Sequence, residues 1–438
     1  MKYVEHREWF MLHEGQEIEV AIEKPAAGGR MIARHHGQVV LVSGAIPGER
    51  VRALVDRAEK RLAYAATRAV VEASADRRAP AADPLCGGNL YAHIAYPRQL
   101  AIKSDIIRDA LARLGRIPCE QPIDVAASPE RGYRMRARCH VRGPRAGFYR
   151  EGTHQLCDTA ITGQLLPESV AALQRLAAAL DREAPGSAAS IELAENAAGD
   201  RRAGHVEIAA GARFDAPALA RIGAAAEVSG VTARGTATGR LLEWGDPVIA
   251  DPLATITGGR AASGELRRQP ESFFQANRFL LAALVTSVID AVPSEGEVLD
   301  LYAGVGLFAV ALAAAGHLKI TAVEGDRTSG TDLRRNATPF APRLAAHVMR
   351  VEDYLASRSR APAACIVVDP PRTGFSKEAA DAIVRHGARR IVYVSCDAPT
   401  LARDARRLLD HGYSLTSIRA FDLFPNTPHV ETLAVFDG

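Results

Sequence analysis

The stretch Val298-Leu-Asp-Leu-Tyr-Ala-Gly-Val-Gly-Leu-Phe-Ala309 decides the fold of the C-terminal part of this chain. An apolar strand runs into a turn that contains Gly304 and Gly306, and a helix begins directly after the turn. Glycines at such a turn let the backbone N–H groups of the helix start approach a ligand closely. Glu324 ends the next predicted strand, where its carboxylate can accept hydrogen bonds from a ribose. These residues also satisfy a loose dinucleotide fingerprint, so the turn alone leaves NAD, another cofactor of this kind and a purely structural turn as alternatives.

Strand-like and helix-like segments alternate around this turn. The apolar strand-like segments are 297–303, 319–325, 364–370 and 390–396, and the helix-like segments include 379–388 and 400–412. This βα alternation predicts an α/β fold with a parallel, doubly wound, Rossmann-like sheet over residues 271–438. In such a sheet the ligand crevice lies at the carboxyl ends of the strands.

Two acidic positions favour S-adenosylmethionine over NAD as the cofactor of this crevice. Asp369-Pro-Pro-Arg372 follows an apolar strand. A carboxylate and two prolines at that position form a rigid lip over the crevice, for which nicotinamide binding gives no reason. Asp300 precedes the glycine turn, where it can support the loop beside a methionine moiety.

Cys396 and Glu431 are the candidate catalytic residues. Cys396 ends a strand at the same sheet edge and precedes a helix, whose N-terminus is expected to favour the thiolate. The alternative is an inert buried cysteine, which is how we interpret Cys365 within its strand. Glu431 opens the last apolar strand and is a candidate general base, with a solvent-facing edge glutamate as the alternative.

Methylation of uracil at carbon 5 is a reaction that needs a thiol, a base and a methyl donor. Carbon 5 of uracil is a poor nucleophile until a thiolate adds to carbon 6. Carbon 5 can then take a methyl group, and a base must remove its proton before the thiolate leaves. A cysteine, a base and a methyl donor in one crevice are what this route requires.

The rest of the chain predicts two further domains. Strand-like segments between Gly- and Pro-bearing turns over residues 14–72 indicate a small antiparallel barrel. Its basic residues suit either RNA contact or a solvated surface, and they are Arg30, Arg34, Arg57, Lys60 and Arg61. Residues 73–270 indicate an α+β central domain, with a helix over 97–115 that we expect to pack on the catalytic domain. Within it, residues 132–150 interleave arginines with aromatic residues, a mixture suited to phosphates and stacked bases.

Bulk properties exclude several classes of protein. A chain of 438 residues with 47% apolar residues holds two or three domains, and its net charge of +3 does not by itself identify a nucleic-acid binder. No apolar run is long enough to span a membrane, and the first ten residues lack the apolar core of a secretory signal. Six scattered cysteines do not indicate a disulfide framework, so we expect the protein in the reducing cytoplasm. We also expect a monomer.

Together these motifs resemble the RNA uridine-5-methyltransferase family, which includes the bacterial tRNA and 23S rRNA 5-methyluridine synthases. The matching pieces are SFFQANRF (272–279), VLDLYAGVGLFA (298–309), AVEGD (322–326), VVDPPRTG (367–374), YVSCDAPTLARD (393–404) and FDLFPNTPHVET (421–432). The N-terminal barrel resembles the RNA-binding TRAM domain. Residues 132–141 and 147–158 resemble the central domain of the family, so the resemblance covers nearly the entire chain.

The resemblance implies a role for each candidate residue. Cys396 becomes the nucleophile and Glu431 the base that removes the proton. The residues implied around S-adenosylmethionine are Gln275, Tyr302, Gly304, Glu324 and Asp369. The implied partner is RNA, with 23S rRNA favoured and tRNA the alternative. A non-catalytic RNA-binding or assembly factor that retains the fold is the alternative function.

The chain departs from the family at one cofactor. Many relatives bind a [4Fe–4S] cluster through four cysteines, two of them in a CGGC tetrad. Here the tetrad ends in Asn89, and only Cys86 and Cys157 match ligand positions. Cys139 is a conceivable substitute, although its spacing does not support that role. We therefore predict that the protein binds no cluster and no other metal.

Overall fold

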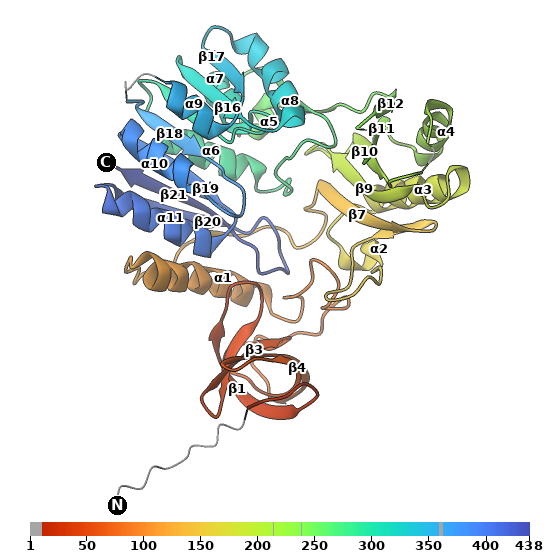
Figure 1. Ribbon diagram of the computed structural model, residues 1–438, viewed down its shortest axis with the longest axis vertical. Coiled ribbons are helices and arrows are strands. Elements are labelled where there is room, and N and C mark those ends of the chain that lie inside the picture. The colour runs from red at the N-terminus through yellow and green to blue at the C-terminus, as the bar shows by residue number, and fades with distance from the viewer. Residues whose placement is uncertain (1–10, 213, 238, 359–361) are drawn as a thin grey trace, which may run out of the picture.

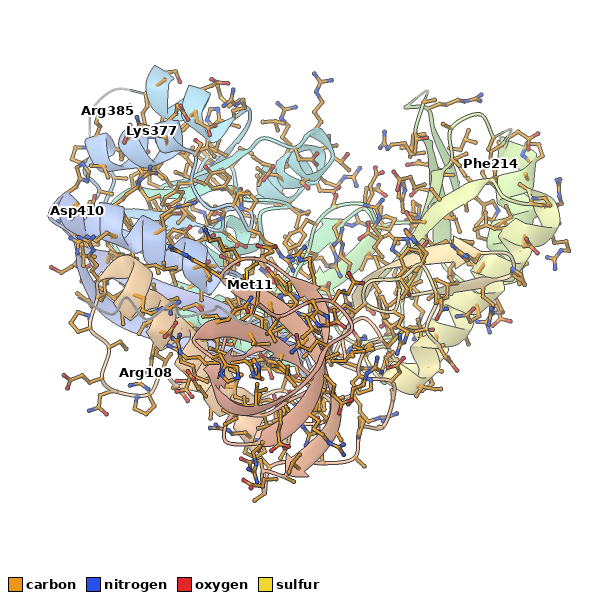
Figure 2. The ribbon with its side chains drawn as sticks, turned by 60° about the horizontal axis from the view of Figure 1, so that its bottom comes forward. Met11, Arg108, Phe214, Lys377, Arg385 and Asp410 are labelled. Carbon is orange, nitrogen blue, oxygen red and sulfur yellow. A yellow bond between two sulfur atoms is a disulfide. The ribbon has the colours of Figure 1, made fainter. Side chains whose placement is uncertain are left out.

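The computed structural model describes residues 11–212, 214–237, 239–358 and 362–438. The first ten residues, where the sequence indicates no secretory signal, lie outside this part. The chain forms three parts: a barrel at the bottom of Figure 1, the catalytic sheet with its helices at upper left, and a second sheet at upper right. Figure 2 brings the barrel forward, and the other two parts flank it. No helix among the described residues is long and apolar enough to cross a membrane.

The N-terminal part is a closed barrel with strand order β1-β2-β3-β5-β4. Its strands are β1 (Glu17–Pro25), β2 (Met31–His35), β3 (Gln38–Ser43), β4 (Arg50–Ala58) and β5 (Leu62–Glu72). Alternate residues of β1 point inward, so that Ile18, Val20 and Ile22 are buried. The predicted barrel is confirmed, with one correction: β3 and β5 pair in parallel, so the barrel is not purely antiparallel.

The central part is a six-stranded sheet covered by helices. The strand order is β12-β11-β10-β9-β7-β8. Its strands are β7 (Arg136–Arg142), β8 (Arg145–Gly147), β9 (Ala188–Glu195), β10 (Arg202–Ile208), β11 (Gly230–Gly235) and β12 (Leu241–Gly245), and its helices are α2 (Thr159–Thr162), α3 (Pro167–Glu183) and α4 (Ala216–Ala226). Leucines of α3 such as Leu173 and Leu176 share one core with Ile191 and Val206 of the sheet.

The catalytic part is an eight-stranded sheet of order β17-β16-β15-β18-β19-β21-β20-β6. Its strands are β6 (Val125–Ala126), β15 (Val298–Leu301), β16 (Ile320–Glu324), β17 (Leu344–Val348), β18 (Cys365–Val368), β19 (Arg390–Ser395), β20 (Ser414–Phe421) and β21 (Glu431–Asp437). The strands from β17 to β19 are parallel, as predicted. The last two strands differ, because β21 runs antiparallel to both β19 and β20.

Helices cover both faces of this sheet (Figure 1). They are α6 (Leu281–Ala291), α7 (Leu307–Ala314), α8 (Arg327–Ala337), α9 (Val351–Ser357), α10 (Lys377–His386) and α11 (Ala398–Asp410), together with the short helix η2 (Thr338–Phe340). The polar faces of α10 and α11 point outward, as Lys377, Arg385 and Asp410 show in Figure 2. A small hairpin of β13 (Ile249–Pro252) and β14 (Glu265–Arg268), with α5 (Leu253–Ile256), connects the central and catalytic parts.

Helix α1 (Tyr96–Ala110), which continues into the π-helical turn η1 (Leu111–Gly115), joins the barrel to the catalytic sheet. Its buried residues Ile102, Ile106 and Ile107 belong to one core cluster with the barrel interior and one face of the catalytic sheet. An added Cβ at Gly115 would lie 3.1 Å from the carbonyl oxygen of Ala402 on α11, which shows how closely the two helices approach. The barrel is therefore packed onto the catalytic part.

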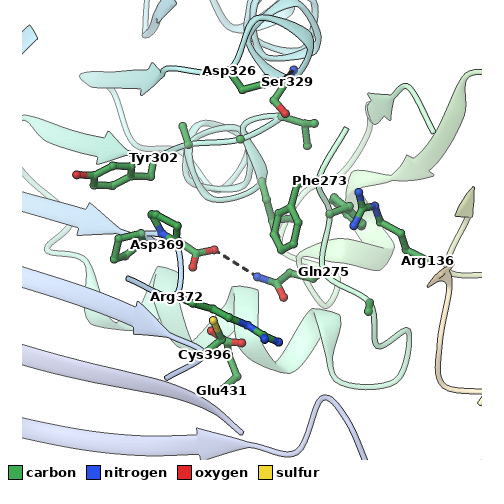
Figure 3. A pocket seen from close by; sticks show the side chains of 18 of the residues that line it. Arg136, Phe273, Gln275, Tyr302, Asp326, Ser329, Asp369, Arg372, Cys396 and Glu431 are labelled. Atoms are coloured by element: carbon green, nitrogen blue, oxygen red, sulfur yellow. Dashed lines mark hydrogen bonds between the residues drawn. The ribbon is translucent and has the colours of Figure 1, made fainter. Parts of the chain in front are cut away.

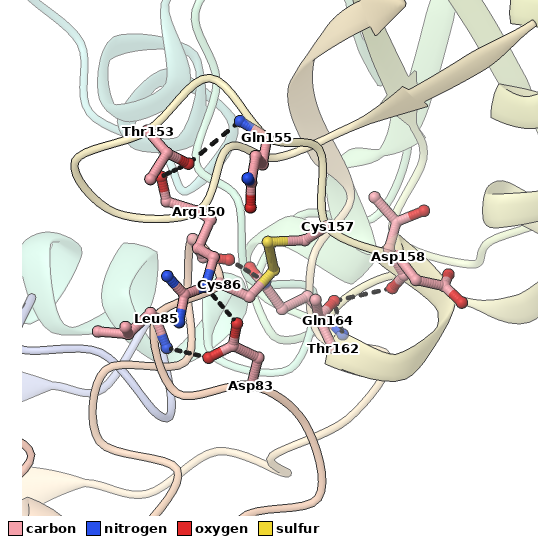
Figure 4. The surroundings of a disulfide bond; sticks show 12 residues. Asp83, Leu85, Cys86, Arg150, Thr153, Gln155, Cys157, Asp158, Thr162 and Gln164 are labelled. Carbon is pink, nitrogen blue, oxygen red and sulfur yellow. Dashed lines mark hydrogen bonds and ion pairs between the residues drawn. A yellow bond between two sulfur atoms is a disulfide. The ribbon is translucent and has the colours of Figure 1, made fainter. Parts of the chain in front are cut away.

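A disulfide joins Cys86 to Cys157 (Figure 4), although the six scattered cysteines gave no indication of disulfides. The two residues are 71 positions apart in sequence, so their spacing gave no sign of pairing. The fold brings their Cα atoms to 5.8 Å, a usual separation for a disulfide. Hydrogen bonds reinforce the contact, since Gly87 N–H donates to the Tyr149 carbonyl and Arg150 donates to Asp83.

Candidate active site

A pocket of about 1000 Å³ lies at the carboxyl ends of β15, β16, β18 and β19. Each of these strands ends in a loop that contributes to its wall, at Tyr302, Glu324, Asp369 and Cys396 respectively. The segment before α6 closes another side with Gln275 (Figure 3). Its position is the crevice in which open parallel sheets bind ligands, and its volume suits a cofactor together with a substrate group.

The turn after β15 is built to leave its backbone accessible. Tyr302 and Gly304 both adopt positive φ angles, of 62° and 57°. An added Cβ at Gly304 would meet no atom within 4 Å, so this side of the turn is open space. Gly304 N–H donates to Glu324 Oε2 at 2.7 Å, and Asp326 N–H donates to Glu324 Oε1 at 2.6 Å. These bonds hold the Glu324 carboxylate at the pocket wall.

Asp300 lies beneath the turn. Its carboxyl is fully buried and accepts a hydrogen bond from Ala309 N–H in α7 at 2.9 Å. Burial is the main cause that raises its pKa to about 8. Asp300 thus braces the glycine turn against the helix, in line with the support that the sequence suggested.

Asp369 and Gln275 face each other across the pocket (Figure 3). Gln275 Nε2 donates to Asp369 Oδ2 at 3.3 Å. Burial raises the pKa of Asp369 to about 7, because its carboxylate has lost much of its hydration. Glu431, which is 4% exposed, has a pKa raised in the same direction by burial and by Asp369.

Two carboxyl groups with raised pKa values in one cavity fit a cationic ligand. A positive charge beside them would favour their ionised forms and offset the desolvation. The sulfonium of S-adenosylmethionine carries such a charge. The open Gly304 turn and the carboxylate of Glu324 add surfaces for the rest of that cofactor, so the residues present fit the group that the sequence predicted.

Cys396 follows β19 and precedes α11, whose first turn is capped by the Asp397 side chain. Its thiol lies beside Glu431 and Arg372 in the same pocket (Figure 3). Burial, Glu431 and Asp369 raise the pKa of Cys396 to about 11. This corrects the expectation that the helix N-terminus favours the thiolate, because desolvation and two neighbouring carboxyl groups outweigh it.

The pocket brings together all seven residues that the sequence singled out, namely Gln275, Tyr302, Gly304, Glu324, Asp369, Cys396 and Glu431. Glu431 is buried at the start of β21, so it is not the solvent-facing edge glutamate of the alternative interpretation. Cys365 is fully buried within β18, as expected.

Sequence reasoning missed several residues that line the same pocket. Arg372 lies beside Cys396, and the exposed Phe273 stacks against Arg136. Arg134 and His429 complete this side of the opening. Arg372 and Phe273 lie within motifs that the sequence analysis identified. Arg372 is close in sequence to Asp369 and Phe273 to Gln275, and this closeness could have identified them as pocket residues.

Cys86 and Cys157 are the two cysteines that the family resemblance relates to an iron–sulfur cluster. They are bonded to each other, and Asn89, which ends the segment Cys86-Gly-Gly-Asn89, is buried. Cys139 is buried in the core of the central part and lies within strand β7, not in a loop. Within the described ranges, no group of three or more His, Cys, Asp or Glu side chains is placed to hold a metal ion.

Comparison with family models gives two matches. Residues 349–437 match the tRNA (Uracil-5-)-methyltransferase family, and residues 12–66 match the TRAM domain. The second match covers the barrel, and the first covers the loops that carry Asp369, Cys396 and Glu431.

Similar proteins extend the match over the whole chain. The 23S rRNA (uracil(1939)-C(5))-methyltransferase RlmD of Pseudomonas putida is 32% identical, over 97% of this chain and 94% of that protein. An uncharacterized RNA methyltransferase of Nitratidesulfovibrio vulgaris is 30% identical, over 97% and 96%. The crystal structure of Pyrococcus abyssi tRNA (uracil-54, C5)-methyltransferase in complex with S-adenosyl-L-homocysteine covers 95% of this chain and 99% of that one, with a TM-score of 0.73 and 24% identity. That structure shares the fold.

Proposed function

This chain belongs to the family of RNA uracil-5-methyltransferases, and from that premise we propose that it methylates carbon 5 of a uridine in 23S rRNA through a covalent bond to Cys396. It is therefore an enzyme. Membership in this family argues against NAD as the cofactor and against a non-catalytic RNA-binding or assembly factor. The methyl donor is S-adenosylmethionine.

The observation that carries the mechanism is the meeting of Cys396, Glu431 and Asp369 in one pocket. A nucleophile and a base must reach opposite ends of one double bond, carbon 6 and carbon 5 of the same uracil. Cys396 and Glu431 come from neighbouring strands β19 and β21, which pair in the sheet. The sheet therefore holds the two groups at a fixed separation.

Cys396 and Glu431 act one after the other. The Cys396 thiolate adds to carbon 6, forming an S–C bond, and the electron pair of the 5,6 double bond moves toward the carbonyl at carbon 4. S-adenosylmethionine, when bound, supplies an electrophilic methyl group to carbon 5. Glu431 then takes the carbon 5 proton. The freed electron pair restores the double bond, the S–C bond breaks, and the thiolate is regenerated.

Five residues hold the cofactor in this proposal. The Glu324 carboxylate, fixed by two backbone N–H groups, is suited to a ribose diol. Gly304 and Tyr302 supply the accessible backbone of the turn. Gln275 and Asp369, which are hydrogen-bonded to each other, would hold the positively charged part of the cofactor.

The choice of 23S rRNA is supported by the relatives named for that substrate. Arg134, Arg136 and Phe273 offer positive charge and an exposed ring at the pocket opening, where nucleotides beside the target uridine would pass. Ribosomal RNA as substrate implies a reaction in the cytoplasm. We also propose that the protein acts without an iron–sulfur cluster, since two of the ligand positions hold no cysteine.

The test is mass-spectrometric mapping of 5-methyluridine in rRNA and tRNA from a strain that lacks the protein. Loss of one modified uridine from 23S rRNA, restored by the wild-type gene, is the expected result. Loss from tRNA alone would overturn the choice of substrate, and no loss from either RNA would overturn the activity.

A further inference from the structure

The pocket makes the proposed nucleophile difficult to ionise. Burial, Glu431 and Asp369 all raise the pKa of Cys396, to about 11. At neutral pH, such a thiol is almost entirely protonated. The thiolate is the reactive form, so the site needs a group that favours the negative charge on sulfur.

Arg372 is the positively charged group that acts on this thiol. Three charged side chains influence Cys396: Glu431 from the start of β21, Asp369 from the end of β18, and Arg372 from the loop after β18. The Arg372 side chain lies beside Cys396 and Glu431 in the pocket (Figure 3). Its charge lowers the pKa of both groups. His429, also near Arg372, has its pKa lowered to about 4 and is neutral at pH 7.

The loop that carries Arg372 is held firmly in place. Gly374 N–H donates to the Pro371 carbonyl at 2.7 Å and closes a turn, in which Gly374 has a φ of 71°. Thr400 Oγ1, in the first turn of α11, donates to the Arg372 carbonyl at 2.9 Å. Arg403 of α11 donates to the Thr373 carbonyl at 2.9 Å.

The same helix also fixes the nucleophile. Cys396 lies two residues before the first residue of α11, so α11 connects the backbone of the thiol to the backbone of Arg372. Asp404, fully buried in α11, accepts hydrogen bonds from Phe375 N–H at 3.0 Å and from the Tyr393 hydroxyl at 2.9 Å. These contacts tie the loop, the helix and β19 into one unit.

We propose that Arg372 is the residue that stabilises the thiolate of Cys396. The inference rests on the proposed function, because it assumes that Cys396 is the nucleophile. On ionisation the S–H bond breaks, the electron pair stays on sulfur and the proton passes to water. The guanidinium then donates a charge-assisted hydrogen bond to the sulfur, which is stronger than its contact with the neutral thiol. Arg372 thereby positions and activates the nucleophile.

The experiment measures the ionisation of Cys396 directly, by its rate of alkylation with iodoacetamide across a pH series. Peptide mass spectrometry separates Cys396 from the other cysteines, and Cys119, a partly exposed free thiol outside the pocket, provides an internal reference. The variants are Arg372→Met, which removes the charge, and Arg372→Lys, which keeps it. Arg350→Met is the matched control, because Arg350 lines the same pocket yet is not among the groups that shift the pKa of Cys396.

In Arg372→Met, alkylation of Cys396 at a fixed pH should fall by about tenfold, with its pH midpoint raised by about one unit. Arg372→Lys should restore part of the rate, and Arg350→Met and the Cys119 reference should not change. An unchanged midpoint in a folded Arg372→Met protein would overturn the proposal. If that variant instead raises the KM for RNA with normal alkylation, Arg372 is an RNA contact and the proposal is wrong.

Alkylation needs neither RNA nor S-adenosylmethionine. The result therefore remains valid if methylation assays fail, and failure of the proposed function is recognised separately by the absence of 5-methyluridine.

Discussion

The ammonium of Lys103 and the carboxylate of Asp422 form an ion pair in which neither side chain is exposed to solvent. Lys103 belongs to α1, and Asp422 begins the loop that leads from β20 to Glu431. Lys103 Nζ also donates to the Phe424 carbonyl at 3.1 Å, and Gln99 of α1 accepts from Asn426 N–H at 2.9 Å in the same loop. Helix α1, which also packs on the barrel, thus holds the loop before the proposed base.

Lys103→Met should lower the free energy of unfolding by about 3–5 kcal/mol, because it leaves the Asp422 charge buried without a partner. Urea unfolding followed by circular dichroism measures the loss. Lys24→Met is the matched control, since the Lys24–Asp109 pair is partly exposed and should contribute at most about 1 kcal/mol. Equal small losses in both variants would show that the buried pair does not hold the loop.

Cys396→Ala should abolish methylation and leave S-adenosylmethionine binding intact, because the thiolate acts on the base and not on the cofactor. Calorimetry measures binding, and incorporation of labelled methyl groups into RNA measures activity. With wild-type enzyme, RNA that contains 5-fluorouridine should form a covalent adduct, because fluorine cannot leave as a proton does. Near-normal turnover of the alanine variant would exclude the covalent mechanism.

Glu431→Gln should stop the reaction after methyl transfer. The amide cannot take the carbon 5 proton, so the S–C bond to Cys396 cannot break. A covalent protein–RNA complex should accumulate on a denaturing gel, and it should be absent from the Cys396→Ala, Glu431→Gln double variant. If Glu431→Gln turns over normally and traps no RNA, another residue is the base.

The rate should rise with pH from about 6.5 to about 9.5. Cys396 and Glu431 both act in their deprotonated forms, and both pKa values are raised above their ordinary values. Raising the pH therefore increases the fraction of enzyme with both groups ready to react. Measurement of kcat/KM across this range checks the direction, with circular dichroism at each pH as the control for folding. A rate that falls over the neutral range contradicts these roles.

Anaerobically purified protein should be colourless near about 400 nm and contain no stoichiometric iron. Two of the four ligand positions lack cysteine, and the remaining Cys86 and Cys157 are bonded to each other. Iron analysis and the absorption spectrum test this, with reduced protein reconstituted with iron and sulfide as the comparison. About four irons per chain would refute the prediction and direct attention to Cys139 and His93.

Local patterns in the sequence predicted the barrel, the doubly wound sheet and the positions of the catalytic candidates. These features depend on neighbours in sequence, because alternation of apolar residues sets a strand and a glycine turn sets the start of a helix. Since parallel strands present their carboxyl ends at one edge, the loops with Gly304, Asp369 and Cys396 could be placed together without a structure. Glu431 was a candidate because a carboxylate opens a buried strand, whereas Gln275 came only from the family resemblance.

Only the tertiary structure decided how these groups influence one another. The pairing of Cys86 with Cys157, the parallel contact of β3 with β5 and the antiparallel entry of β21 join segments that are distant in sequence. The pKa of Cys396 depends on how deeply the thiol is buried and on which charges face it. These charges come from the segment after β18, which carries Asp369 and Arg372, and from Glu431 at the start of β21. A helix start visible in the sequence favours the thiolate, yet desolvation and two carboxyl groups reverse that preference, because electrostatic energies depend on distances in space and not on positions along the chain.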